Sequence, residues 1–370
     1  MNRSQTHKIL DDLNKKMVFL VGPRQVGKTW LSKEILKNFE KGLYLNYDNY
    51  DHREIILKKL WNPALELVVF DELHKMPQWK NYLKGLFDTK EEKLKILVTG
   101  SARLETFRQA GDSLAGRFFR HRLLPFSLSE LENPNYSDQD KLIFQGGFPE
   151  PFLEKQRQDA DRWRLIYVDG LIRTDILDFE RIYDFKAMQQ LLEILRRSVG
   201  SNISFQSISE DISISPNTVK KYIQILEELF IIFRVTPYSK NISRSLVKEP
   251  KLYFYDTGMV IGDEGAKYEN FVALSLLKHT FQIEDYQGKK ANLKYFKTRN
   301  GQEVDFALIV NDEVEFILEA KLTDKKLHSG LNYFSNKYDF KAIQLIKNLS
   351  IDKFIGRIEI RNSFEFLKGF

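Results

Sequence analysis

The run GPRQVGKT at residues 22–29 constrains the fold of this 370-residue chain more than any other feature. It directly follows the apolar run MVFLV (17–21) and precedes the helix-compatible stretch WLSKEILKNF (30–39). Glycines and a lysine at this spacing let a loop curl so that backbone N–H groups and the start of the next helix face phosphate groups. The sequence therefore predicts a strand, a phosphate-binding loop and a helix, in that order.

Two side chains at the end of this loop have specific expected roles. Lys28 is expected to reach the β and γ oxygens of ATP, and the Thr29 hydroxyl to bind Mg²⁺. ATP and Mg²⁺ are therefore the expected ligands of this part of the chain. The residues expected around them are Gly22, Pro23, Arg24, Gln25, Val26, Gly27, Lys28, Thr29, Trp30 and Asp71.

Acidic residues end a second apolar run. LVVFDE (67–72) ends in Asp71 and Glu72, and carboxylates at the end of a parallel strand lie at the same sheet edge as a phosphate loop. We expect Asp71 to hold Mg²⁺ through water, and Glu72 to orient and deprotonate the attacking water. The alternative is that the two acids only cap a helix. In the run KILVTGSAR (95–103), Thr99 and Ser101 are expected to hydrogen-bond the γ-phosphate or the water.

Arg117, in SLAGRFF, is a candidate for the cation that stabilises charge on the transferred phosphoryl group. It would act in its own subunit or across an oligomer interface. The alternative is an ordinary surface or salt-bridge arginine.

Short apolar runs alternate with amphipathic segments over the first third of the chain, which is typical of a parallel sheet covered by helices. The expected fold class is α/β, with an αβα P-loop domain over residues 1–130. Its predicted strands are residues 17–21, 43–47, 65–70, 95–99 and 117–126. A mostly helical connector is expected over 131–185, interrupted by the turn QGGFPEP.

The next segment, 186–258, has a helical period. Ser215 and Pro216 provide an N-cap and a first helical residue. The helix that follows has its apolar residues on one face, namely Val219, Tyr222, Ile223, Leu226, Leu229 and Phe230. With the short helices before it and the β-rich stretch after it, this order predicts a winged helix-turn-helix.

Polar residues of this segment are candidates for contacts to DNA. They are Asn217, Lys220, Lys221 and Gln224 on the recognition helix, and Lys240, Arg244, Lys248 and Lys251 in the wing. The alternative is a solvated polar face on a module that couples the P-loop domain to its neighbour. Glu227 and Glu228 reduce the positive charge.

Taken together, these motifs resemble an AAA+-type ATPase family of bacteria and archaea, which joins a P-loop domain to a C-terminal restriction-endonuclease-like domain of unassigned role. The resemblance covers nearly the whole chain. It implies ATP binding and hydrolysis and leaves the physiological task open. The matching segments are GPRQVGKT, VVFDELHK, LVTGSAR, LAGR with LPFSLSE, GGFPE, IRTDI, PKLYFYDTG, EVDF and EAK.

The C-terminal α/β domain, residues 259–370, contains a second constellation. Asp305 lies on one predicted strand, and Glu319 and Lys321 lie two residues apart on the next, so their side chains face the same side. Two carboxylates can bind Mg²⁺ and a lysine beside them can position water, as phosphodiester hydrolysis requires. The set resembles the metal-dependent nuclease core of restriction enzymes, and the resemblance adds Glu269 as a further acid. Val304 stands where that motif usually has proline.

Two functions therefore remain open for the C-terminal domain: a nuclease, or a domain that keeps the fold for binding while its strand acids and lysines form ordinary salt bridges. The first reading makes DNA the expected partner. The second makes the chain a nucleotide-controlled switch that binds a protein partner. The sequence also leaves a homo-oligomer open.

Composition excludes several other kinds of site. Without cysteine, the chain can form no disulfide, thiolate zinc site or cysteine nucleophile. No apolar run approaches the length of a membrane span, and the N-terminus is unlike a signal peptide, so a cytoplasmic protein without a membrane partner is expected. The formal charge of +6 permits nucleic-acid binding but does not indicate it.

Overall fold

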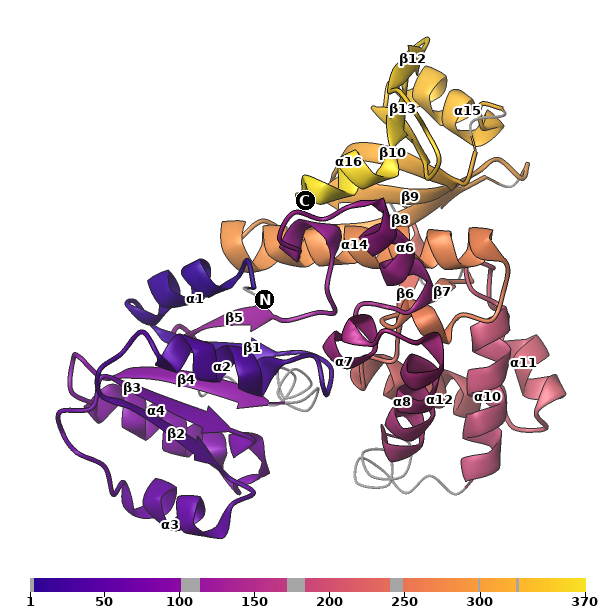
Figure 1. Ribbon diagram of the computed structural model, residues 1–370. Helices are drawn as coiled ribbons and strands as arrows, with labels where there is room; N and C mark the ends of the chain where they lie inside the picture. The colour runs from indigo at the N-terminus through magenta and orange to yellow at the C-terminus, as the bar shows by residue number, and fades with distance from the viewer. Residues whose placement is uncertain (1–2, 101–113, 172–183, 240–248, 299, 324–325) are drawn as a thin grey trace. The chain divides into compact units, whose positions relative to one another are not determined.

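The computed structural model describes residues 3–100, 114–171, 184–239, 249–298, 300–323 and 326–370. The chain divides into two compact units, Met1–Leu124 and Pro125–Phe370. Each unit contains a β-sheet with helices packed against it (Figure 1).

The first unit is built on a five-stranded parallel sheet with strand order β2-β3-β4-β1-β5. The strands are β1 (Met17–Val21), β2 (Gly42–Asn46), β3 (Leu67–Asp71), β4 (Lys95–Gly100) and β5 (Phe118–Arg122). Most of their residues are buried, because helices cover both faces of a parallel sheet. This confirms the predicted α/β class with an N-terminal parallel sheet.

Alternation along the strands explains how the helices divide between the two faces. Phe19 and Phe70 share one buried cluster with Trp79 of α4 (Trp79–Thr89). Residues such as Val18 and Leu20 face the other side, where α1 (Thr6–Leu13) and α2 (Lys28–Leu36) contact the sheet. The short helices α3 (Tyr50–Lys58) and η1 (Leu73–Lys75) complete the unit.

The second unit begins with helices. They are η3 (Leu128–Glu130), α6 (Tyr136–Phe144), α7 (Pro149–Leu153), α8 (Arg157–Gly170), α10 (Phe185–Arg197), α11 (Phe205–Asp211) and α12 (Pro216–Glu228). The predicted start of α12 is confirmed, since the Ser215 hydroxyl accepts a hydrogen bond from the Thr218 N–H at 3.1 Å and Pro216 is the first helical residue. The apolar stripe of α12 is buried at Val219, Tyr222 and Ile223.

An eight-stranded mixed sheet follows, in the order β12-β13-β11-β10-β9-β8-β6-β7. Its strands are β6 (Ile232–Pro237), β7 (Lys251–Phe254), β8 (Ala291–Lys297), β9 (Glu303–Val310), β10 (Glu313–Lys321), β11 (Ala342–Ile346), β12 (Lys353–Ile355) and β13 (Ile358–Asn362). The turn η5 (Thr257–Met259) and the helices α14 (Glu264–Gln287), α15 (Ser329–Tyr338) and α16 (Ser363–Lys368) lie between or after them.

The helices α14 and α15 cover opposite faces of this sheet. Leu308 of β9 packs with Ile283 of α14, whereas the next residue, Ile309, belongs to a separate buried cluster with Leu331 and Phe334 of α15. Since neighbouring residues on a strand point to opposite faces, α14 and α15 enclose the sheet between them.

The boundaries predicted inside this unit stay predictions, as do its descriptions as a winged helix-turn-helix and a nuclease-like domain. Strands β6 and β7 of the segment 186–258 lie in the same sheet as the strands after residue 259. In the described part of the chain, no helix combines the length and the apolar character needed to span a bilayer.

Candidate active site

The phosphate loop, Asp71 and Thr99 meet at the carboxyl edge of the first unit's sheet. β1 ends at Val21, directly before the loop, and β3 ends at Asp71. In the parallel register, Asp71 is paired with Thr99 of β4, and Thr99 is paired with Leu20 of β1. The structure therefore brings the phosphate loop and the acidic end of β3 together, so that Thr29 contacts Asp71, which is 42 residues later in the sequence.

The loop depends on two glycines. A Cβ on Gly22 would lie 2.1 Å from the carbonyl oxygen of Leu123, so a side chain here would push into the backbone after β5. Gly27 has φ 96° and ends the loop as the residue before α2, in a left-handed conformation that glycine adopts without strain. Together they let the loop turn tightly from strand to helix.

Lys28 is buried and bends back over the loop. Its Nζ donates hydrogen bonds to the carbonyl oxygens of Gly22, at 3.0 Å, and Pro23, at 2.5 Å. The ammonium is thereby held beside the turn. A phosphate oxygen could replace one of these carbonyl oxygens as its hydrogen-bond acceptor, so the charge of Lys28 would not lose its solvation.

The remaining loop residues differ in exposure. Val26 is buried, and its carbonyl accepts a hydrogen bond from Arg3 at 2.7 Å. Arg24 and Gln25 are exposed, and Trp30 in the first turn of α2 is 45% exposed. The side chains of Arg24, Gln25 and Trp30 therefore lie around the loop, whereas Val26 is part of its interior.

Three hydroxyl groups converge on the carboxylate of Asp71. Thr29 Oγ1 donates to Asp71 Oδ2 at 2.9 Å, Tyr44 donates to the same oxygen at 2.5 Å, and Thr99 Oγ1 donates to Asp71 Oδ1. Burial, followed by the contact with Asp71, raises the pKa of the Tyr44 hydroxyl well above its usual value. Asp71 is thus fixed in orientation.

Two of these contacts differ from the sequence-based expectations. Thr99 was expected to face the γ-phosphate or the water, but its hydroxyl holds Asp71 instead. Tyr44 was not predicted, because the motif does not show which strand lies beside β3. Its only sequence signal is a polar side chain in the run LYLNY (43–47), which becomes β2.

Glu72 follows Asp71 in a left-handed backbone conformation, φ 56° and ψ 23°, and its N–H donates to the Thr99 carbonyl at 3.1 Å. Burial raises the pKa of its carboxyl, and Asp71 acts in the same direction against the nearby Lys75. Among the described residues, Oε2 of Glu72 is buried and accepts no hydrogen bond, although it lies 3.5 Å from His74 Nε2 and 3.7 Å from Lys75 Nζ. Such a carboxylate oxygen suits a hydrogen bond to water or substrate.

The donors at this edge fit a magnesium ion. Thr29 offers a hydroxyl beside the Asp71 carboxylate, and hard oxygen ligands of this kind are what Mg²⁺ prefers. In the described ranges, no group of three or more His, Asp or Glu side chains is placed to hold a metal ion by itself. Any ion here would therefore take its further ligands from nucleotide and water.

Arg117 lies at the opposite edge of the sheet from the phosphate loop. Its carbonyl accepts a hydrogen bond from the N–H of Met17, the first residue of β1. Its guanidinium pairs with Asp88, at 2.8 and 3.0 Å, which raises the pKa of Arg117. The structure therefore does not bring Arg117 to the phosphate loop of its own subunit, and its role toward phosphates, in its own subunit or across an interface, stays a prediction. Ser101 lies outside the described residues.

The predicted C-terminal residues also come together. The Asp305 N–H donates to Glu319 Oε2 at 3.1 Å across the β9–β10 pair, and the Ala320 N–H donates to Asp305 Oδ2 at 3.2 Å. Lys321 Nζ donates to Glu319 Oε1 at 2.6 Å. Burial raises the pKa of Glu319 to about 8, and the charge of Asp305 adds to the effect.

A lysine that was predicted to lie in a DNA-binding wing occupies the centre of this cluster. Lys251 begins β7 and is 3% exposed, so it is not a surface residue. Its Nζ lies 2.8 Å from a carboxylate oxygen of Glu303 and 3.2 Å from Oδ1 of Asp305. Glu269 of α14 lies 3.9 Å from the same ammonium and accepts a hydrogen bond from Tyr253.

This arrangement does not fit a divalent metal ion between Asp305 and Glu269. The ammonium of Lys251 already lies against both acids, and a divalent cation beside it would meet strong repulsion. All four carboxylate oxygens of Asp305 and Glu319 accept hydrogen bonds from protein N–H groups.

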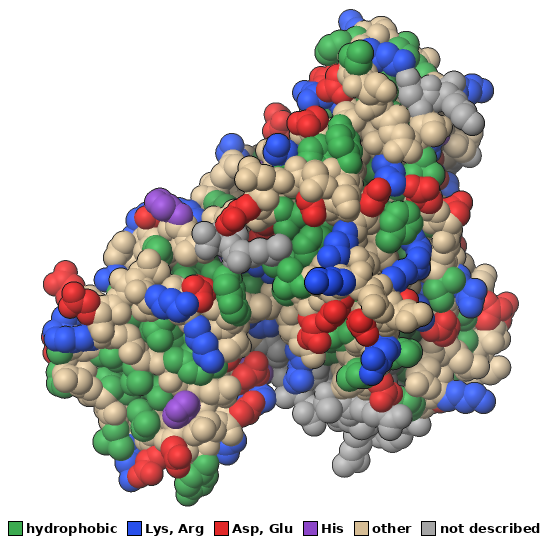
Figure 2. All heavy atoms as spheres, viewed as in Figure 1, with side chains coloured by type: hydrophobic (Ala, Val, Ile, Leu, Met, Phe, Trp, Pro, Cys, Tyr) green, Lys and Arg blue, Asp and Glu red, His purple; other side chains and the backbone are tan. Residues whose placement is uncertain are grey.

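On α12, the polar side chains expected to face solvent do so: Asn217, Lys220, Lys221 and Gln224 are exposed. The remaining predicted wing residues, Lys240, Arg244 and Lys248, lie outside the described residues. Figure 2 shows acidic and basic side chains interspersed on the visible face, rather than gathered in one large basic area.

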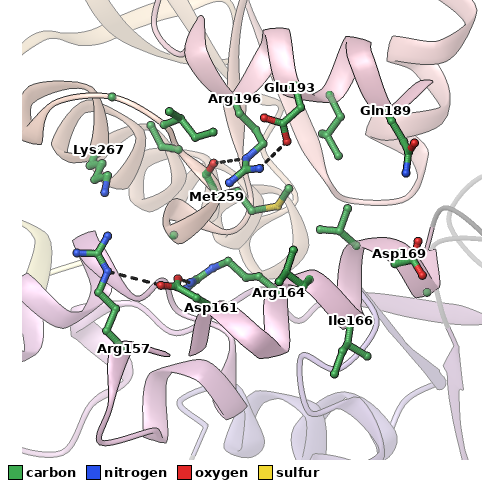
Figure 3. A pocket seen from close by; sticks show the side chains of 18 residues that line it. Arg157, Asp161, Arg164, Ile166, Asp169, Gln189, Glu193, Arg196, Met259 and Lys267 are labelled. Atoms are coloured by element: carbon green, nitrogen blue, oxygen red, sulfur yellow. Dashed lines mark hydrogen bonds and ion pairs between the residues drawn. The ribbon is translucent and has the colours of Figure 1, made fainter. Parts of the chain in front are cut away.

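A pocket of about 1240 Å³, which was not predicted, lies in the second unit between α8, α10 and residues 258–262. Charged side chains around it pair with one another, as Figure 3 shows for Arg196 with Glu193 (2.6 Å) and Arg157 with Asp161 (3.9 Å). Burial lowers the pKa of Lys267, and the charge of Arg157 lowers it further. The pocket is therefore mixed, with apolar walls and charges that are largely neutralised.

Comparison with protein families divides the chain into three matched segments. Residues 14–132 match the AAA domain family, residues 136–264 match a domain of unknown function (DUF8612), and residues 264–360 match a second domain of unknown function (DUF4143). The first match and the parallel sheet with its phosphate loop identify an AAA-type P-loop ATPase domain in the first part of the chain, which implies nucleotide binding.

Several proteins are similar over much of the chain. An uncharacterized protein of Mycobacterium tuberculosis is 25% identical over 78% of this chain, which spans 66% of that relative's length. An uncharacterized protein of Methanocaldococcus jannaschii is 27% identical over 95% of this chain and 84% of its own length. A Walker-type ATPase of Pyrococcus abyssi is similar in structure, with 16% identity, a TM-score of 0.45, and coverage of 69% of this chain and 93% of that one.

Proposed function

We propose that the chain hydrolyses ATP at the carboxyl edge of the first sheet. The observation that carries this proposal is the difference between two adjacent acids. Three hydroxyl groups hold the carboxylate of Asp71 in one orientation, whereas Glu72 has a buried oxygen that accepts no hydrogen bond among the described residues. A carboxylate held in one orientation suits metal binding, and a carboxylate oxygen that accepts no hydrogen bond, even with Lys75 at 3.7 Å, suits a catalytic base.

Each residue has a distinct task in this proposal. The loop and Lys28 bind the phosphates, and Thr29 and Asp71 hold Mg²⁺, which neutralises charge on the phosphate oxygens when bound. Glu72 accepts a proton from the attacking water.

Paired variants test this assignment. Lys28→Ala should lose ATP binding, whereas Glu72→Gln should keep binding and lose hydrolysis, since it removes the base but not the phosphate contacts. Glu92→Gln, an exposed acid of the same unit, serves as the control and should keep full activity. Phosphate release and binding of a fluorescent ATP analogue measure the two properties. Undiminished turnover in Glu72→Gln would refute the role of Glu72 as the base.

We propose further that the nucleotide state controls binding by the second unit, with DNA as the partner read by α12. The support is the exposed row of Asn217, Lys220, Lys221 and Gln224 on a capped, well-packed helix. Lys220→Ala should weaken DNA binding and make the slope of log K against log salt concentration shallower, by the equivalent of about one phosphate contact. Lys93→Ala, an exposed lysine of the first unit, should change neither. ATP-dependent capture of a protein, without DNA affinity, would favour the partner-binding switch instead.

The sequence also suggested a Mg²⁺-dependent nuclease at Asp305, Glu319 and Lys321. The buried ammonium of Lys251 supports the alternative, a nuclease-like cluster that cuts nothing. A cleavage assay with Mg²⁺ or Mn²⁺, with and without ATP, decides between them on single-stranded, duplex and branched DNA. Cleavage that Asp305→Ala abolishes would establish the nuclease, and Lys28→Ala would show whether ATP controls it.

A further inference from the structure

The acidic cluster of the second unit draws its carboxylates from elements that are far apart in sequence. Glu303 and Asp305 belong to β9, Glu269 to α14 and Glu319 to β10. Lys251, on the last strand of the sheet, reaches three of them, and its Nζ also lies 5.6 Å from the ring centre of Tyr295. One ammonium thus joins a helix to a central strand.

The charges of the cluster nearly balance without any added ion. Four carboxylates, those of Glu269, Glu303, Asp305 and Glu319, face three ammonium groups, those of Lys251, Lys297 and Lys321. Buried carboxylates need partners, and here the chain supplies them.

The location of Lys251 is also the location that an ion would need. A divalent ion bound by Asp305 and Glu269 must lie between their oxygens, at about 2–2.6 Å from each. Lys251 Nζ already lies 3.2 Å from Asp305 and 3.9 Å from Glu269, and the residue is too deeply buried to move its charge into water without disturbing β7.

We infer that Lys251 is a built-in replacement for a metal ion: its ammonium supplies the positive charge that a divalent cation would bring, so that the cluster binds no divalent metal. This inference rests on the non-cutting form of the proposed function. It predicts that removal of the ammonium, rather than addition of acids, converts the cluster into a metal site.

Binding of Mn²⁺ alone to the nucleotide-free full chain tests the inference, with free Mn²⁺ measured by electron paramagnetic resonance. Wild type and Asp305→Asn should bind Mn²⁺ equally, because any contribution of the phosphate-loop site is common to both. Lys251→Ala should gain about one ion per chain, and Lys251→Ala with Asp305→Asn should lose it again.

Lys297→Ala is the matched control. Lys297 pairs with Glu303 at 2.9 Å but its side chain is 39% exposed, so the variant removes the same charge without vacating the position between Asp305 and Glu269. It should gain no ion. Lys251→Met keeps more of the side-chain volume and serves if the alanine variant does not fold, as judged by circular dichroism and thermal unfolding.

Two results would overturn the inference: Mn²⁺ binding by wild type that Asp305→Asn removes, or a folded Lys251 variant that gains no ion. ATP hydrolysis by the same preparations keeps the two proposals distinct, since the ATPase proposal stands or falls on Glu72→Gln and Lys28→Ala, whatever happens at the cluster.

Discussion

The hydroxyl of Tyr44 tests how the first unit orients Asp71. In Tyr44→Phe the ring remains and one of the three hydrogen bonds to the carboxylate is lost. A hydrogen bond to a charged group contributes about 1.5–3 kcal/mol. Tyr44 is only half-buried, so water partly replaces the hydroxyl, and we expect a loss of about 1–2 kcal/mol.

That loss corresponds to a decrease of about 5-fold to 30-fold in kcat/KM, since about 1.36 kcal/mol equals one factor of ten. Because Asp71 is proposed to hold Mg²⁺, the decrease should be greatest at limiting Mg²⁺ and smaller when Mg²⁺ saturates. A coupled ATPase assay over a series of Mg²⁺ concentrations at fixed ATP measures both limits.

Tyr47→Phe is the control, because the ring of Tyr47 contacts Arg53 rather than Asp71. It should keep wild-type activity at every Mg²⁺ concentration. Thermal unfolding of both variants checks that the sheet is intact. The reasoning is refuted if Tyr44→Phe, equally stable, loses less than about 2-fold in kcat/KM at limiting Mg²⁺, or if the two variants lose activity alike.

Three further outcomes are expected. Gly22→Ala should abolish binding of a fluorescent ATP analogue because its Cβ would lie 2.1 Å from the Leu123 carbonyl, whereas Gly85→Ala, with nothing within 4 Å, should bind normally. Glu319 has a pKa raised to about 8, so its contribution to stability is complete below its ordinary pKa and is lost as the pH rises through 8. Urea unfolding should therefore show a flatter pH dependence for Glu319→Gln than for wild type. Arg117→Ala should leave ATP hydrolysis unchanged in dilute protein, and a loss confined to high protein concentration would reveal action across an interface.

Local sequence patterns predicted the features whose structure depends on residues close together in the sequence. The strand over 17–21 was predicted at its observed limits, because a short apolar run before a glycine-rich loop has few other conformations. The pairing of Asp305 with Glu319 was also accessible. Their strands form a tight hairpin whose turn residues, Asn311 and Asp312, both have positive φ, which places the two acids on neighbouring strands. The exact register was not accessible, because a bulge between Val314 and Phe316 shifts the pairing by one residue.

The contacts that the sequence did not predict are those that depend on the order of the strands in the sheets. Tyr44 meets Asp71 only because β2 lies beside β3, and no local pattern states which strands are neighbours. Lys251 was placed in a solvent-exposed wing, because basic residues precede it in the sequence. Its burial depends on β7 and β6 joining a sheet whose remaining strands, β8 to β13, come later. The strand β5 ends at Arg122, four residues before the predicted limit, because Leu123 leaves the sheet to pass over Gly22.

The sharing of one sheet by β6, β7 and the later strands limits how the chain can be divided. β6 pairs with β8 through Thr236 and Pro237, so a polypeptide that began at residue 259 would leave β8 as an open edge. Unpaired edges of this kind favour aggregation. Such a fragment would also lack Lys251 and leave its buried acids without their counter-ion. Poor solubility of that fragment would reflect the cut itself rather than a weakness of the intact chain.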